Sequence, residues 1–404
     1  MRNGLLGVLI AALAVVHASA ADLAVRGQVV RPVAGPAIAD GVILVEDGKI
    51  VAVGPSAEVP IPAGARVLEA AVVTPGLVDV RTVVGLAGIY NSSQGQVQDQ
   101  DQLEDSDPVQ PELRAIDAYD AVEPLVLWSR SLGVTTIHTG HGPGAIVSGQ
   151  TLIAKTRGET VEESVIRPVA ALAADLGPSV SRNFESPGTR AKGAAVLREA
   201  LVAAGVYRAK RDGENPPDRD LGLETLAAVL DGEIPLVLTA HTATDIATAL
   251  RLADEFGFRL WLDGAAEAYR MVEPIREAGV PVLLHATMLR AVGEARNLSL
   301  GTARTLAEAG IPFAIQTGFE SYVPKARVLL YEAQAAVHAG LSDDDALTAI
   351  TLSPARILGI DDRVGSLEVG KDADLVLFDG DPFEYVSHVC TVVIEGNVVS
   401  DVCR

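Results

Sequence analysis

Histidine and aspartate side chains follow several apolar runs of strand length, and both residue types can bind a metal ion or move a proton. The runs cover residues 133–137, 235–238, 259–262 and 281–284, and the polar residues that follow them are His138, His141, His241, Asp263 and His285. Three imidazoles and one carboxylate are enough for zinc if they converge, so His138, His241, Asp263 and His285 form one candidate metal site. Alternatively, each is a hydrogen-bonded pocket residue.

Convergence requires the apolar runs to be neighbouring strands of one sheet. From about residue 72 to residue 357, runs of strand length alternate with helical patterns such as residues 243–256 and 266–278. This alternation predicts a parallel α/β architecture that begins with Val72-Val73, and its length suits a (β/α)8 TIM-like barrel. The carboxyl ends of such strands share one pocket. A doubly wound open sheet is the alternative architecture.

Both ends of the chain have the pattern of antiparallel sheet. Short β-branched runs separated by Gly and Pro turns fill residues 21–70, and similar runs return from residue 365 to residue 402. We therefore expect the two termini to fold together. The prediction is a composite β-sandwich domain of residues 21–73 and 360–404, interrupted by a barrel of residues 74–359.

The composition is that of a globular protein and argues against nucleic acid as a partner. Of 404 residues, 49% are hydrophobic, and 32 basic residues face 53 acidic ones, for a formal charge of -21. A protein that neutralises phosphates needs a basic face, which this composition does not supply.

The first twenty residues have the pattern of an export signal. Arg2 precedes an apolar run from Leu5 to Val16, and Ala18-Ser19-Ala20 places small residues before a cleavage point. The run is too short to span a bilayer. We expect an exported, periplasmic or secreted protein that begins at Ala21 and has no membrane partner after cleavage; an uncleaved anchor is the alternative.

The cysteines Cys390 and Cys403 flank a predicted terminal hairpin, and export would permit a bond between them. With a two-residue turn at Glu395-Gly396, Cys390 faces Asp401 and Cys403 lies diagonally across on the same face, so a disulfide is feasible. With a three-residue turn the thiols point to opposite faces. The turn type decides between these alternatives.

Four stretches of the chain resemble the amidohydrolase superfamily of metal-dependent hydrolases, closest to its exported imidazolonepropionase-like branch. They are Asp47-Gly48-Lys49-Ile50-Val51-Ala52-Val53-Gly54, Val73-Thr74-Pro75-Gly76-Leu77-Val78-Asp79, Leu352-Ser353-Pro354-Ala355-Arg356-Ile357-Leu358-Gly359, and residues 365–376, which read GSLEVGKDADLV. The four stretches are distributed over the whole chain after residue 20, and their order and spacing make the resemblance specific. The resemblance implies the same barrel and composite sandwich, and it implies a divalent metal, zinc, that activates a water for attack on a carbon-nitrogen bond.

The resemblance also implies ligand positions, and most of them carry other residues here. The expected His-x-His pair falls on Arg81 and Val83, the later histidines on Thr239 and Gly264, and the proton-moving aspartate on Gly318. His241 is the one imidazole that fits the pattern, as the second residue of a His-Ala-His stretch. A guanidinium adds a fixed positive charge where a cation should bind, so the implied site is degenerate, and the protein would then hold no metal.

Lys155 and residues 94–111 each allow two interpretations. In some relatives a carboxylated barrel lysine bridges two metals. Lys155 is either such a ligand or a salt-bridged or solvated lysine. Residues 94–111 form a polar stretch that suits a lid over the pocket or a disordered loop.

Two functions follow. The first is hydrolysis of a carbon-nitrogen bond in a small molecule such as a cyclic amide, with Arg81, Asp263 and His285 as pocket candidates for catalysis. The second is a catalytically silent homologue that binds a ligand or serves as partner subunit of an active paralogue, in a homo-oligomer or hetero-oligomer. In either case Arg81 would hold a substrate carboxylate, with His138 and His141 as further substrate-binding candidates.

Overall fold

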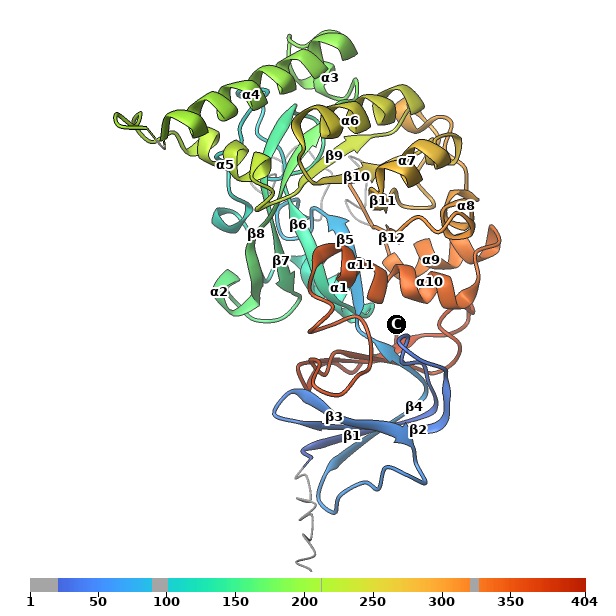
Figure 1. The fold of residues 1–404 in the computed structure, drawn as a ribbon. Helices are drawn as coiled ribbons and strands as arrows, with labels where there is room; N and C mark the ends of the chain where they lie inside the picture. The colour runs from blue at the N-terminus through green and yellow to red at the C-terminus, as the bar shows by residue number, and fades with distance from the viewer. Residues whose placement is uncertain (1–20, 89–100, 212, 320–326) are drawn as a thin grey trace, which may run out of the picture.

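The computed structural model describes residues 21–88, 101–211, 213–319 and 327–404. The predicted export signal of residues 1–20 lies outside these ranges, as do residues 94–100 of the predicted lid. The described chain contains two sheets, and helices surround the larger one, the upper sheet in Figure 1. No helix within these ranges has the length and apolar character needed to cross a membrane.

The upper sheet is an eight-stranded, nearly closed barrel whose strands follow one another in chain order. They are β5 (Leu77–Thr82), β6 (Val134–Gly140), β7 (Val147–Lys155), β8 (Val165–Asp175), β9 (Leu236–Ala240), β10 (Leu260–Gly264), β11 (Val282–Leu284) and β12 (Phe313–Ile315). The predicted barrel is thereby confirmed, and the open-sheet alternative is wrong.

The prediction of an all-parallel barrel is wrong for one strand. β7 pairs antiparallel with both β6 and β8, whereas the other neighbouring strands run parallel. Only residues 141–146 connect β6 to β7. A parallel crossover needs a dozen or more residues, so this short connection forces β7 to return in the opposite direction.

The second sheet has seven strands in the order β15-β14-β13-β4-β1-β2-β3, and both ends of the chain contribute to it, as predicted. Its strands are β1 (Leu23–Val30), β2 (Ile38–Glu46), β3 (Lys49–Pro55), β4 (Arg66–Pro75), β13 (Leu375–Phe378), β14 (Val389–Ile394) and β15 (Asn397–Ser400). Val72-Val73 belongs to β4 and is not a barrel strand, because β4 continues to Pro75 and Gly76 alone separates it from β5. A Cβ at Gly76 would collide with Thr135, so glycine allows this close passage from one sheet to the other.

Cys390 and Cys403 form a disulfide. The hairpin has the two-residue turn, since Ile394 pairs with Asn397. An irregularity at Val392 then shifts the register, and Val389 exchanges two backbone hydrogen bonds with Arg404. Cys390 therefore lies directly opposite Cys403, not opposite Asp401.

Helices and short 3-10 turns connect the barrel strands and cover the outside of the barrel (Figure 1). They are η1 (Ala115–Asp117), α1 (Pro124–Ser131), α2 (Val161–Ser164), α3 (Val180–Asn183), α4 (Arg190–Arg211), α5 (Leu221–Leu230), α6 (Ala243–Phe256), η2 (Ala268–Arg270), α7 (Val272–Ala278), η3 (Gly293–Ala295), α8 (Thr302–Glu308), α9 (Leu329–His338), α10 (Asp343–Ala349) and α11 (Leu352–Leu358).

Local capping explains why α6 has the predicted bounds. The Thr242 side chain accepts a hydrogen bond from the Asp245 N–H at the start of the helix, and Gly257 ends it with a φ of 73°.

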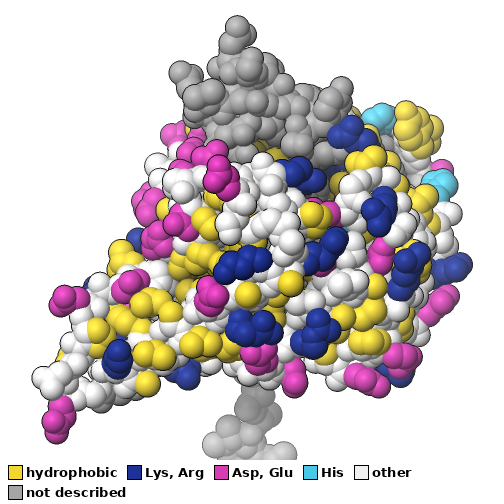
Figure 2. Space-filling view, turned by 90° about the horizontal axis from the view of Figure 1, so that it is seen from above, with side chains coloured by type: hydrophobic (Ala, Val, Ile, Leu, Met, Phe, Trp, Pro, Cys, Tyr) yellow, Lys and Arg dark blue, Asp and Glu magenta, His cyan; other side chains and the backbone are white. Residues whose placement is uncertain are grey.

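Helices α4 and α5 form an arm that projects from the barrel, on which hydrophobic side chains are visible in Figure 2. Val202, Val206 and Leu221 of this arm are exposed.

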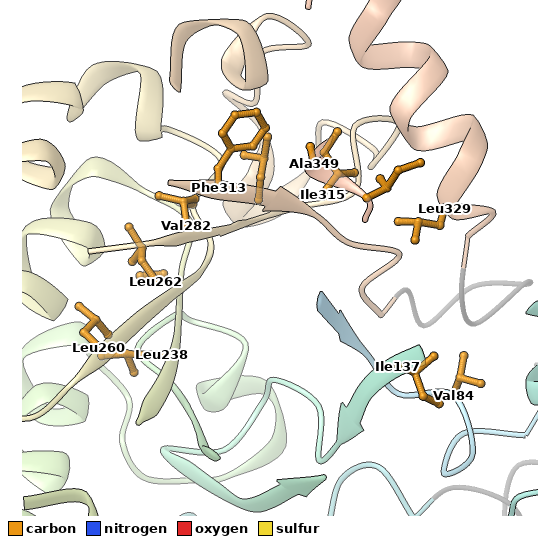
Figure 3. Packing of buried hydrophobic residues seen from close by; sticks show 14 of the residues in the cluster. Val84, Ile137, Leu238, Leu260, Leu262, Val282, Phe313, Ile315, Leu329 and Ala349 are labelled. Atoms are coloured by element: carbon orange, nitrogen blue, oxygen red, sulfur yellow. The ribbon is translucent and has the colours of Figure 1, made fainter. Parts of the chain in front are cut away.

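Barrel strands bury both faces, and alternate residues point to different cores. On β9, Leu238 packs in the large cluster between strands and helices, where Figure 3 shows it with Leu260, Leu262 and Val282. Its neighbour Val237 belongs to a second cluster inside the barrel, together with Trp261, Leu283 and Ala314. The residues two positions further along these four strands are Thr239, Asp263, His285 and Gln316. They therefore lie inside the barrel as well, one layer closer to its carboxyl end.

Asp79 helps to close the barrel between β5 and β12. Its carboxylate accepts hydrogen bonds from the Thr317 N–H (3.1 Å) and the Thr317 hydroxyl, and the Gly318 N–H donates to the Arg81 carbonyl (3.1 Å). Burial, the largest influence, raises the pKa of Asp79 from 3.8 to about 7.

We expect Asp79→Asn to change how stability depends on pH. Because the folded-state pKa is raised, the folded protein binds this proton more tightly than the unfolded chain does. The contribution of this proton to the free energy of unfolding is complete below pH 3.8 and is lost as the pH rises to about 7. The free energy of unfolding of the wild type minus that of D79N should therefore fall across this window, by at most about 1.4 kcal/mol per pH unit. Urea unfolding at a series of pH values measures it, and parallel curves for the two proteins would contradict the expectation.

Candidate functional site

A pocket at the carboxyl end of the barrel strands contains most of the polar residues that the sequence pointed to. Its wall includes Arg81, His241, Asp263 and His285, with Val83, Leu289 and Phe319 among its apolar residues. The cavity measures about 610 Å³ when the open solvent at its mouth is included.

Asp263 lies at the centre of the site. Its Oδ2 accepts a hydrogen bond from the Thr239 hydroxyl (2.6 Å), and its Oδ1 accepts one from the Gln316 side-chain amide (2.7 Å). The same amide also donates to the Leu283 carbonyl (2.8 Å). Two neutral donors thus fix a carboxylate that is only 4% exposed.

Arg81 is a buried cation in the same pocket, also 4% exposed. Its guanidinium donates to the carbonyl oxygens of Thr82 (3.3 Å) and His141. Among the described residues, no carboxylate oxygen lies within 4.0 Å of it. Burial lowers the pKa of Arg81, and the more distant charges of Asp263 and Asp79 counteract that shift. The guanidinium keeps its charge at neutral pH, and of its five N–H donors only two are bonded to described residues.

His285 and His241 are neutral imidazoles beside Asp263. Burial lowers the pKa of His285 to about 4, and it also lowers the pKa of His241. Nδ1 of His285 lies 2.6 Å from the Ala286 carbonyl oxygen, so it must carry the proton and donate. Nε2 of His285 is then an acceptor. It is buried and has no hydrogen-bond partner in the described part of the chain, and the same holds for Nδ1 of His241.

The other two predicted imidazoles lie outside this pocket. β6 continues to Gly140, which places His138 within the strand and not after it. Its Nδ1–H donates to the Val80 carbonyl, its Nε2 accepts from the Thr151 hydroxyl (2.7 Å each), and its ring packs edge-on against Trp261. Both nitrogens are occupied in the barrel core. Burial, assisted by the charge of Arg81, lowers the pKa of His138 to about 3.

His141 does not line this pocket and is connected to it only through a backbone hydrogen bond. Its carbonyl oxygen accepts from Arg81, while its imidazole lies beside a second cavity formed with Leu113 and Arg114. The structure therefore brings Arg81, His241, Asp263 and His285 together and separates His138 and His141 from them.

Comparison with known proteins agrees with the sequence motifs. The model of the amidohydrolase family matches residues 290–399. A crystal structure of an amidohydrolase from Thermotoga maritima MSB8 is 30% identical, covers 94% of this chain and 100% of that chain, and superimposes with a TM-score of 0.87. The chain belongs to the amidohydrolase family.

Two curated relatives carry more specific names. Amidohydrolase tasK of Hapsidospora irregularis is 26% identical over 89% of this chain, and an imidazolonepropionase of Thermoplasma volcanium is 31% identical over 32% of it. The alignments span 40% and 33% of those two proteins, respectively. The chain thus matches less than half the length of each.

Amidohydrolase-family proteins usually use a divalent metal, and the donors in this pocket do not fit one. Arg81 and Val83 line the pocket where the first pair of imidazoles was expected, and Thr239 is engaged with Asp263. Within the described ranges, no group of three or more His, Cys, Asp or Glu side chains is arranged to hold a metal ion. The predicted set of His138, His241, Asp263 and His285 fails because His138 has no free nitrogen.

Gly264 shows why the missing imidazole cannot simply be restored. Its φ of 78° lies in the left-handed region that favours glycine. A Cβ at this position would lie 2.6 Å from Cε1 and 3.0 Å from Nδ1 of His241. The His241 ring thus fills the space in which a histidine at position 264 would begin.

Lys155 has no role in the pocket. Because β7 runs antiparallel, its last residue lies at the opposite end of the barrel, where the Lys155 ammonium contacts the carboxylates of Asp374 and Asp372 (3.1 Å). The salt-bridge interpretation of Lys155 is confirmed. The sequence pattern did not identify Thr239 or Gln316 as a partner of Asp263, although alternation from Val237 and Ala314 predicts that both face inward.

Proposed function

We propose that this amidohydrolase-family protein binds a small molecule with a carboxylate at the barrel mouth, without metal-assisted hydrolysis. Arg81 carries the proposal. Its guanidinium is buried in the pocket and has no carboxylate oxygen of a described residue within 4.0 Å. It occupies a position where the family pattern has a metal-binding imidazole. A planar guanidinium with free N–H groups binds a carboxylate by two parallel hydrogen bonds. A bound anion would also compensate the buried charge.

Hydrolysis of a carbon-nitrogen bond is the second candidate. It is favoured by the relatives, which are named amidohydrolase and imidazolonepropionase. The pocket keeps two neutral imidazoles and a carboxylate that are able to transfer protons, so this candidate has groups of its own. Against it, the described residues contain no group of donors that is arranged to hold a metal ion.

Metal analysis together with two assays separates the candidates. For the purified full chain we expect less than about a tenth of an equivalent of zinc, manganese or iron, and no hydrolysis of hydantoin after these metals are added. In isothermal titration calorimetry, N-acetylglycine should bind and its neutral methyl ester should not. A full equivalent of metal with metal-dependent turnover would overturn the proposal in favour of the second candidate. Equal binding of acid and ester would also overturn it.

We further infer that the protein is exported. The apolar segment before Ala21 and the Cys390–Cys403 disulfide support this inference independently, because disulfides persist mainly in oxidising compartments. Fractionation of the producing cells, with N-terminal sequencing of the product, tests it. A cytosolic protein that retains its first residues would contradict it.

A further inference from the structure

We propose that the pocket also selects for an N–H group in its ligand, and that Asp263 and Nε2 of His285 are the acceptors that recognise it. The inference rests on the proposed binding of a carboxylate by Arg81. It defines the ligand class as a carboxylate with a nearby N–H donor, as in an acylated amino acid.

The first step is the state of His285. The ring is 3% exposed, and its Nδ1–H is committed to the Ala286 carbonyl. Nε2 therefore presents a lone pair and no proton. This atom has no hydrogen-bond partner among the described residues. A buried acceptor without a donor costs about 1 to 3 kcal/mol. His285 lines the pocket, so a ligand donor that reaches its buried Nε2 would remove this cost.

The second step is the position of Asp263. Asp263 lies in β10, where it pairs with the inward-facing Leu283, and His285 directly follows the neighbouring parallel strand β11, two residues beyond Leu283. Both line the same pocket, and the charge of Asp263 influences the pKa of His285. Each Asp263 oxygen accepts one hydrogen bond from the protein, and a carboxylate oxygen has two acceptor sites.

The third step is the arrangement of charge. Among the described residues, the Arg81 guanidinium has no carboxylate oxygen within 4.0 Å, and the same pocket contains His285, whose Nε2 has no donor there, and Asp263, whose oxygens each have one. A simple carboxylate would satisfy Arg81 and leave Nε2 of His285 unpaired. A ligand that combines a carboxylate with an N–H group satisfies both sides, and sites that hydrogen-bond a ligand N–H reject analogues that lack it.

The experiment compares N-acetylglycine with O-acetylglycolate, in which an ester oxygen replaces the amide N–H and the carboxylate is kept. We expect calorimetry to give at least about tenfold tighter binding of N-acetylglycine to the wild type. In the variants Asp263→Asn and His285→Leu, the affinity for N-acetylglycine should fall, while the affinity for O-acetylglycolate should change little. The ratio of the two affinities should therefore fall.

Three outcomes are distinguishable. A preference for N-acetylglycine that falls in either variant supports the inference. Equal binding of both compounds to the wild type, or a preference that persists in both variants, overturns it and leaves the Arg81 proposal intact. If neither compound binds, the proposed function itself fails. Urea unfolding of both variants verifies that they are folded, and Asp263→Glu, which keeps the carboxylate, is the conservative control.

Discussion

The variant Arg81→Met should bind N-acetylglycine about ten to one hundred times more weakly than the wild type, because it loses a charge-assisted pair of hydrogen bonds in a buried site. Methionine fills a similar volume without charge. Calorimetry measures the effect directly. The affinity of Arg81→Lys for N-acetylglycine is expected to lie between those of the wild type and R81M, since an ammonium retains the charge but not the planar pair of donors.

The binding result can be separated from a folding defect. Arg81 also donates to the carbonyl oxygens of Thr82 and His141, and R81M leaves them without that donor. The unfolding midpoint of each variant is therefore measured in parallel. An affinity for N-acetylglycine that is unchanged in a folded R81M would refute the role of Arg81.

The largest loss of stability is expected for Lys155→Met. The ammonium of Lys155 contacts Asp374 and Asp372, and all three side chains are 2 to 3% exposed. Asp372 keeps Lys49 (2.5 Å) and Arg363 (2.9 Å) as partners, but Asp374 loses its cation. Removing one member of a buried ion pair typically costs about 3 to 5 kcal/mol, because the remaining charge stays in a dry environment.

Two matched variants identify the cause of that loss. Arg198→Met breaks an exposed pair with Glu255, whose side chains are 41% and 42% exposed, and should cost less than about 1 kcal/mol. The double variant K155M/D374N removes both charges and should recover part of the loss. Urea unfolding compares them, and a K155M variant no less stable than R198M would show that the buried pair contributes little.

The sequence predicted the architecture because the architecture depends on local patterns. The alternation of apolar runs and helical stretches predicted the barrel. Helix α6 begins after Thr242 and ends before Gly257, at the predicted residues. The β-branched runs at both ends predicted the composite sheet. The antiparallel direction of β7 was not predicted, because it depends on the length of the connection at residues 141–146, which is too short for a parallel crossover.

For the site, the sequence identified the residue types and the strands that carry them, and it determined that the usual metal ligands are replaced. Tertiary structure decided which of the remaining groups act together. In the sequence, His138 and Asp263 both follow apolar runs. In the structure, β6 continues two residues beyond His138, whose nitrogens are both bonded in the core, whereas Asp263 is the next-to-last residue of β10 and lines the pocket. The difference arises because strand length and register, set by contacts between distant segments, determine the layer of the barrel in which a side chain lies.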